Sequence, residues 1–212
     1  MTGTKATALD RFCRETGRAF TRFDYGGHGA SSGRFADGTI GGWLDDALAI
    51  LDQVARGPVV LVGSSMGGWI ASLVAIARPD RVAGLVTLAA APDFTHRLIE
   101  GRMTPAQREA LARDGFIVDP SDYDPAGYEI RRTLLDEGRN HLILGGPVPI
   151  RCPVRMIHGT EDTDVPWSLS AELLARIESA DATLTLVKGA DHRLSAPADI
   201  ARMEAAVAEL AR

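Results

Sequence analysis

The stretch Pro58-Val-Val-Leu-Val-Gly-Ser-Ser-Met-Gly-Gly-Trp69 decides the fold of this chain. Its apolar first part predicts a buried strand, Pro58 to Val62, and the residues from Trp69 to Ala77 predict a helix. Between them, Gly63 to Gly67 fits the pattern G-x-S-x-G. In a strand–turn–helix setting this pattern is typical of a sharp turn that exposes a serine hydroxyl above a sheet, with glycines two residues either side that let strand and helix approach closely. We therefore expect Ser65 to be a nucleophile.

The same region could be mistaken for a membrane span, because Gly57 to Ala77 carries no charge and is about as long as a transmembrane helix. The glycines and serines at its centre make a poor helix, so two elements that meet at a turn fit better. Met1 to Ala6 lacks the apolar core of a signal peptide. The chain has two cysteines, too few for a disulfide framework. These features predict a protein without a membrane span and, by default, a cytoplasmic location.

Outward from this stretch, strand-like and helix-like segments alternate, which predicts an α/β fold with a mostly parallel sheet between helices. The predicted strands are Ala19–Asp24, Val59–Val62, Val82–Leu88, Pro153–Ile157 and Thr183–Val187. Helices are predicted around Ala6–Cys13, which Gly17 closes, and Trp43–Val54, and at the C-terminus, where Ser195 is the candidate N-cap and Leu210 the last apolar position.

A long segment between Ala91 and Pro153 interrupts this alternation. Thr104-Pro-Ala-Gln107 is a capping-box start with proline at the first helical position, so it predicts a helix to about Arg113. A second amphipathic stretch, Tyr128 to His141, predicts another helix. Insertions of this length are often lids over a site. We expect a core from residues 1–92 and 151–212, with residues 93–150 as a helical cap.

A serine nucleophile needs a base, and the chain has five histidines. His192 follows the predicted strand Thr183–Val187, which is where the base falls in this architecture. His158 ends an apolar strand and is expected to be packed and structural. His28 is expected to make loop contacts, and the two histidines of the insertion, His96 and His141, to face solvent. His192 is therefore the predicted base.

A third group must orient the imidazole. Glu161, Asp162 and Asp164 all follow the strand Pro153–Ile157, and any of them gives the chain order serine, acid, histidine. Asp191 adjoins His192 and is expected to be too close in sequence to reach the ring nitrogen. The residues alone leave the choice among the three carboxylates open.

The chain resembles the α/β-hydrolase superfamily and, within it, the branch of mitochondrial palmitoyl-protein thioesterases that also cleave acyl glucuronides. The stretches that carry the resemblance are Thr2–Ala6, Arg22–Gly26, Gly63–Trp69, Cys152-Pro153, His158-Gly159, Asp162, Val165–Trp167 and Asp191–Arg193. The resemblance implies that Ser65 is the nucleophile, Asp162 the acid and His192 the base. It also implies that the backbone amide of Met66 is one oxyanion donor.

The resemblance predicts a chain shortened at its N-terminus. In this superfamily three strands precede the position of residue 1, and the loop after the third supplies a second oxyanion amide. The third strand would lie between Ala19–Asp24 and Val59–Val62, so we expect a gap in the sheet and a weakened oxyanion hole.

The leading interpretation is a serine hydrolase that acts on small-molecule or protein-linked acyl esters or thioesters, without cofactor or metal. The alternative is a silent hydrolase-like domain that binds an acyl ligand or a protein partner. A dehalogenase or epoxide hydrolase would need a carboxylate where Ser65 stands. Lys and Arg number 23 and Asp and Glu 28, for a net charge of −5, which argues against nucleic-acid binding. No feature of the sequence sets the oligomeric state.

Overall fold

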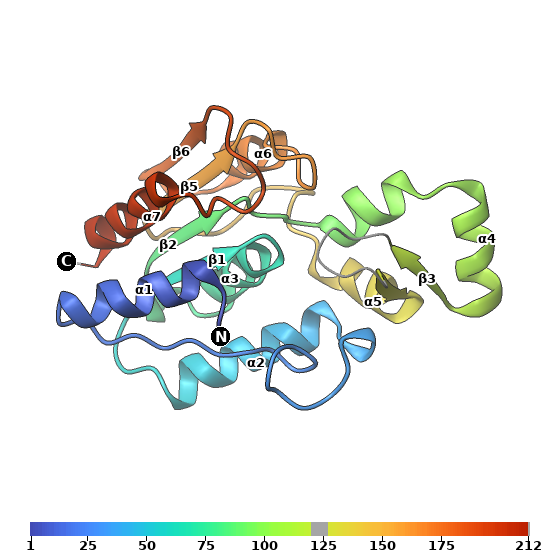
Figure 1. Cartoon of the computed structure of the whole chain (residues 1–212), viewed down its shortest axis with the longest axis horizontal. Coiled ribbons are helices and arrows are strands. Elements are labelled where there is room, and N and C mark those ends of the chain that lie inside the picture. The colour runs from blue at the N-terminus through green and yellow to red at the C-terminus, as the bar shows by residue number, and fades with distance from the viewer. Residues whose placement is uncertain (120–126, 212) are drawn as a thin grey trace. The chain divides into compact units, whose positions relative to one another are not determined.

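The computed structural model describes residues 1–119 and 127–211, which form two compact units (Figure 1). The first unit, called the core unit below, comprises Met1–Phe23, Ala47–Pro92 and Ile143–Arg212. The second comprises Asp24–Asp46 and Asp93–Leu142. The second unit thus contains residues 24–46 as well as residues 93–142 of the insertion. The division into 1–92, 93–150 and 151–212 stays a prediction.

A four-stranded parallel sheet forms the centre of the core unit. Its strands lie in the order β1 (Val59–Ser64), β2 (Val82–Leu88), β5 (Val154–Gly159) and β6 (Ala182–Val187). Four of the five predicted strands are therefore confirmed, and all four run the same way. Because they are parallel, their carboxyl ends meet at one edge, where Ser64, Gly159 and Val187 end their strands.

Helices cover both faces of this sheet, as predicted for a mostly parallel sheet between helices. On one face α1 (Thr4–Glu15) and α7 (Pro197–Leu210) lie side by side (Figure 1) and pack on Val86, Leu88 and Ile157. The buried residues that alternate with these along β2, Leu85 and Thr87, point to the opposite face. There α3 (Met66–Ala77) packs against β1 and β2, and α6 (Ser168–Arg176) packs against β6. Helix α2 (Ile40–Gln53) contains the boundary between the two units at residues 46 and 47.

Three local expectations for the core unit were wrong. Residues 19–24 form no strand, because an extended segment becomes a β-strand only when it pairs with a neighbouring strand. Among the described residues, β1 pairs with β2 alone. Val59 to Val62 are consequently half-buried at a sheet edge, whereas β2 is buried as expected. The N-cap of α7 is Ala196, not Ser195, because Pro197 fits the first helical position.

In the second unit, the predicted capping box is confirmed: Thr104 and Gln107 bond reciprocally at the start of α4 (Pro105–Asp114). The helix predicted over Tyr128–His141 was wrong in its first turn. Residues 128–131 form β4 (Tyr128–Arg131), which pairs antiparallel with β3 (Phe116–Asp119), and the helix α5 covers only Arg132–Gly138. Pairing across the two segments outweighs the helical periodicity of the sequence.

Short helical turns complete the described chain, at Phe35–Asp37, Pro79–Arg81, Thr95–Glu100 and Arg139–His141. No helix within residues 1–119 and 127–211 is long and apolar enough to cross a membrane.

Candidate active site

Ser65 lies in a strained turn between β1 and α3. Its backbone dihedral φ is 54° and ψ is −123°, a conformation that residues other than glycine rarely adopt. Two backbone hydrogen bonds hold Ser65 in this conformation. Its N–H donates to the carbonyl of Leu88, the last residue of β2 (2.9 Å), and its carbonyl accepts the N–H of Ala91, which follows β2 (3.1 Å). The neighbouring strand therefore fixes the turn that presents the Ser65 hydroxyl.

Close packing at this turn depends on Gly63 and Gly68. A Cβ on Gly63 would lie 2.2 Å from the Gly67 carbonyl oxygen, and one on Gly68 would lie 2.8 Å from Cβ of Ala90. A Cβ on Gly67 would meet no atom within 4 Å. The expectation that both flanking glycines of the motif are needed for close approach was therefore wrong for Gly67. Gly68, one residue beyond the motif, takes that place.

His192 faces the serine across the turn. Its Nε2 lies 3.0 Å from Ser65 Oγ, and its side chain is 15% exposed. The loop after β6 is fixed by Asp191, whose Oδ1 accepts the N–H groups of Arg193 and Leu194. Leu194 is fully buried. Lys5 on α1 donates a hydrogen bond to the Arg193 carbonyl. Asp191 thus shapes the loop that carries His192, a contribution that spacing alone did not reveal.

Asp162 completes the constellation on the other side of the imidazole. Its Oδ2 lies 2.7 Å from His192 Nδ1, and its side chain is fully buried. Its Oδ1 accepts the backbone N–H groups of Asp164 (3.0 Å) and Val165 (2.8 Å). Burial raises the pKa of this carboxyl, but hydrogen bonds from His158, His192 and the Val165 N–H outweigh burial and hold the pKa well below its usual range.

Of the three carboxylates left open by the sequence, the structure brings Asp162 to His192. Of the other histidines, His158 also contacts Asp162, and the remaining three contact other residues. His158 is fully buried, as expected, and His28 packs edge-on against the rings of Phe35 and Trp43 in the second unit. His96 is half-exposed beside Glu100, whereas the side chain of His141 is only 20% exposed and contacts Glu137. The expected solvent-facing position is therefore found for His96, whereas the side chain of His141 is mostly buried.

The hydrogen bonds define the state of the imidazole. A carboxylate accepts, so the Nδ1–H of His192 donates to Asp162, and in the neutral ring the lone pair on Nε2 is left to accept the Ser65 hydroxyl proton. Met66 is the first residue of α3. The Gly68 N–H of the first turn donates to the Ser65 carbonyl, whereas the N–H groups at the very start of a helix have no acceptor within the helix. They give the helix N-terminus its affinity for negative charge.

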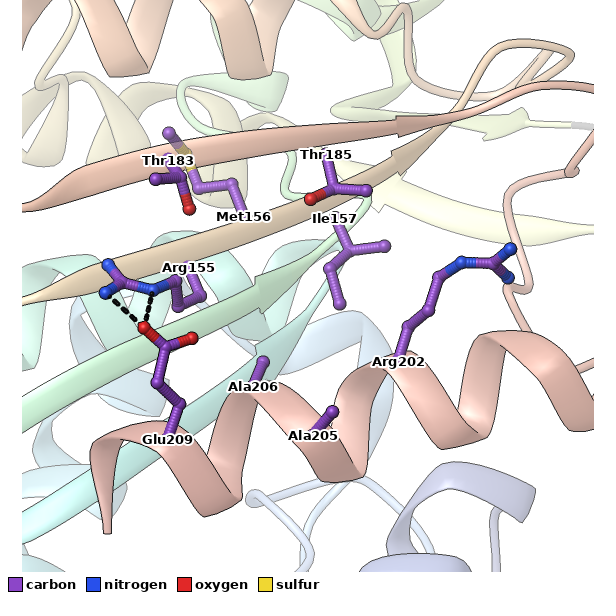
Figure 2. A pocket seen from close by; sticks show the side chains of 9 residues that line it. All are labelled: Arg155, Met156, Ile157, Thr183, Thr185, Arg202, Ala205, Ala206 and Glu209. Carbon is purple, nitrogen blue, oxygen red and sulfur yellow. Dashed lines mark hydrogen bonds and ion pairs between the residues drawn. The ribbon is translucent and has the colours of Figure 1, made fainter. Parts of the chain in front are cut away.

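A separate hollow of about 360 Å³ lies between β5, β6 and α7 in the core unit. Figure 2 shows that Arg155 and Glu209 face one another across it, and Arg202 lies at its other end. Both arginines are paired, Arg155 with Glu209 at 2.6 Å and Arg202 with Asp199 at 3.0 Å. None of Ser65, Asp162 and His192 lines it. Its charges are used within the fold, so we assign it no ligand.

Comparison with known proteins agrees with this fold. The model of the Alpha/beta hydrolase family matches residues 6–209. The mouse mitochondrial palmitoyl-protein thioesterase ABHD10 is 42% identical over 201 residues, which cover 94% of this chain and 67% of that protein. Among solved structures, mouse alpha/beta hydrolase domain-containing protein 10 has a TM-score of 0.91 at 40% identity, and a putative hydrolase from Agrobacterium vitis S4 has 0.96 at 42%. Each alignment covers 100% of this chain and 84% of the other.

The chain belongs to the α/β hydrolase family. It spans about two thirds of the length of the curated mammalian relatives that it matches. The expected cytoplasmic location is wrong on this comparison, because those relatives from mouse, rat and cattle are named as mitochondrial proteins. A low number of cysteines suggests a reducing compartment, but it does not distinguish one reducing compartment from another.

Proposed function

We propose that this protein is a serine hydrolase that cleaves acyl esters or thioesters through an acyl-enzyme on Ser65. One observation carries the proposal: a continuous line of hydrogen bonds runs from Ser65 Oγ through both nitrogens of His192 to Asp162. Residues 127 positions apart in sequence meet within 3.0 Å. The strained backbone of Ser65 is of the kind that clusters at functional sites.

The proposed reaction has two halves. In the first, Ser65 Oγ attacks the carbonyl carbon while its proton passes to His192 Nε2, and Asp162 stabilises the imidazolium. The N–H of Met66 stabilises the oxyanion, and His192 then returns the proton to the departing alcohol or thiol. In the second half, His192 takes a proton from water as the water oxygen attacks the acyl carbon. His192 then gives that proton to Ser65 Oγ as the bond between Oγ and the acyl carbon breaks, and the free acid leaves.

The substrate class rests on the relatives. The mammalian relatives at about 40% identity are named palmitoyl-protein thioesterases, so an acyl thioester is the first substrate to try. A p-nitrophenyl acyl ester tests the ester alternative with the same chemistry, because both substrates pass through the same acyl-enzyme.

A fluorophosphonate probe tests the proposal, because it labels only an activated serine. We expect the wild-type chain to label and to hydrolyse one of the two substrates, and Ser65→Ala to lose both properties. Ser64→Ala is the matched control, since it removes the neighbouring hydroxyl from the same turn. A wild-type chain that binds an acyl ligand but neither labels nor turns over would instead establish the silent binding domain. Labelling that persists in Ser65→Ala would reject the assignment of the nucleophile.

A further inference from the structure

A second imidazole contacts the carboxylate of Asp162. His158 Nε2 lies 3.0 Å from Asp162 Oδ2, the same oxygen that faces His192, and 3.0 Å from the Val165 carbonyl oxygen. His158 Nδ1 lies 2.7 Å from Ser170 Oγ in α6. His158 and Ser170 are both fully buried. All of these residues belong to the core unit.

The partners of His158 define which nitrogen carries its proton. Nε2 faces two oxygens that only accept, a carboxylate and a carbonyl, so Nε2 must be the donor. Nδ1 faces a hydroxyl, which can donate or accept, so a neutral ring with its proton on Nε2 takes the hydrogen of that bond from Ser170. Every polar atom of the buried ring is satisfied in the neutral form protonated at Nε2.

Neutrality has a consequence for Asp162. A second cation beside the carboxylate would compensate the charge that has to stabilise the imidazolium of His192. A neutral donor orients the carboxylate and leaves its charge in place. Oδ1 is already held by the N–H groups of Asp164 and Val165, so the contact with His158 fixes the remaining oxygen.

We propose that His158, anchored by Ser170, is a positioning residue that holds Asp162 Oδ2 toward His192. The proposal rests on the serine hydrolase function proposed above. His158 acts through Asp162 only, because its hydrogen bonds go to Asp162, Val165 and Ser170 and none reaches Ser65. The sequence hides this role, since a histidine at the end of an apolar strand reads as part of the core.

Two polar variants separate positioning from packing. In His158→Gln, the side-chain amide reaches the place of Nε2 and can still donate to Asp162. In His158→Asn, the shorter amide can partner Ser170 but does not reach the carboxylate. Both variants replace the buried ring by an amide, so a general loss of packing affects them alike. We expect His158→Asn to lower kcat about ten- to a hundred-fold, as loss of a hydrogen bond to a charged group does, with KM unchanged. His158→Gln should restore most of kcat.

Nuclear magnetic resonance gives a readout that does not depend on turnover. With ¹⁵N-labelled histidine, wild-type His158 should be protonated at Nε2 and not at Nδ1 at neutral pH. The low-field proton of the bond between His192 Nδ1 and Asp162 should be present in the wild type and His158→Gln. It should be broadened or lost in His158→Asn. Ser170→Ala, which keeps the ring but removes its anchor, should weaken the same signal.

The results that overturn the proposal are specific. They are a His158 protonated at Nδ1, a low-field signal unchanged in a folded His158→Asn or Ser170→Ala variant, or equal kcat in His158→Asn and His158→Gln. A wild-type chain that fails to label with fluorophosphonate would reject the serine hydrolase instead. The resonance measurements would still decide whether His158 holds Asp162.

Discussion

The backbone of Gly63, the next-to-last residue of β1, lies so close to the backbone of Gly67 in the first turn of α3 that no side chain fits between them. A Cβ on Gly63 would lie 2.2 Å from the Gly67 carbonyl oxygen and 2.8 Å from Cα of Gly68. Those atoms are backbone, so they have no rotamer through which to move aside. The contact sets how sharply the chain turns at Ser65.

Gly63→Ala should therefore damage both stability and reactivity. The added methyl group must push strand and helix apart, and overpacking of this kind costs about 1–3 kcal/mol. We expect a lower melting temperature and slower fluorophosphonate labelling. Gly67→Ala is the matched control, since its Cβ would meet no atom within 4 Å and alanine favours a helix. It should leave the melting temperature unchanged or raise it. Equal damage in the two variants would contradict this account.

Gly159 sets a second close approach, between the loop that carries Asp162 and the loop that carries His192. A Cβ on Gly159 would lie 2.1 Å from the Ala190 carbonyl oxygen, which accepts the Glu161 N–H at 3.0 Å. Gly159→Ala should separate the two loops and slow fluorophosphonate labelling more than Gly145→Ala, whose Cβ would meet nothing within 4 Å. Identical labelling rates would show that the loops hold their positions by other contacts.

Asp162→Asn should abolish most of the turnover. An amide donates where the carboxylate accepts, so it favours the wrong tautomer of His192, and in serine hydrolases this lowers kcat by about ten-thousand-fold. Asp164→Asn makes the same chemical change two residues away, on an exposed residue whose backbone N–H donates to Asp162 Oδ1. It should change kcat little. Steady-state hydrolysis of both variants checks the assignment, and a larger loss in Asp164→Asn would reverse it.

The stability of the fold should also depend on Asp162 in acid. Its pKa in the folded protein lies below the ordinary value of 3.8. Asp162 therefore adds to the free energy of unfolding at pH values above 3.8, and this stabilisation is lost as the pH falls toward the folded pKa. The difference in unfolding free energy between wild type and Asp162→Asn should be constant above about pH 6 and should shrink below about pH 4. Urea unfolding at a series of pH values measures it. A difference that grows on acidification would contradict the prediction.

Much of this arrangement could be predicted from local sequence, because the signals are local. Apolar runs marked the four strands, and the turn around Ser65 is encoded by residues within a few positions of it. The choice of Asp162 needed a family resemblance, since three neighbouring carboxylates satisfy the same spacing. Strand pairing between distant segments could not be predicted from the sequence, because whether residues 19–24 and 128–131 form strands depends on which segments lie beside them. The contact between His158 and Asp162 depends on how the loop after β5 folds back.

The positive φ of Ser65 means that the residue proposed as nucleophile also lowers the stability of the fold. A side chain held in such a backbone conformation costs about 1–3 kcal/mol, and only glycine escapes the cost. Ser65→Gly and Ser65→Ala both lack the hydroxyl, yet the glycine variant should melt at the higher temperature and also above the wild type. A chain selected only for heat resistance would therefore drift toward glycine here and become inert. On the proposed function, the serine at this position therefore provides a reactive hydroxyl at the expense of thermal stability.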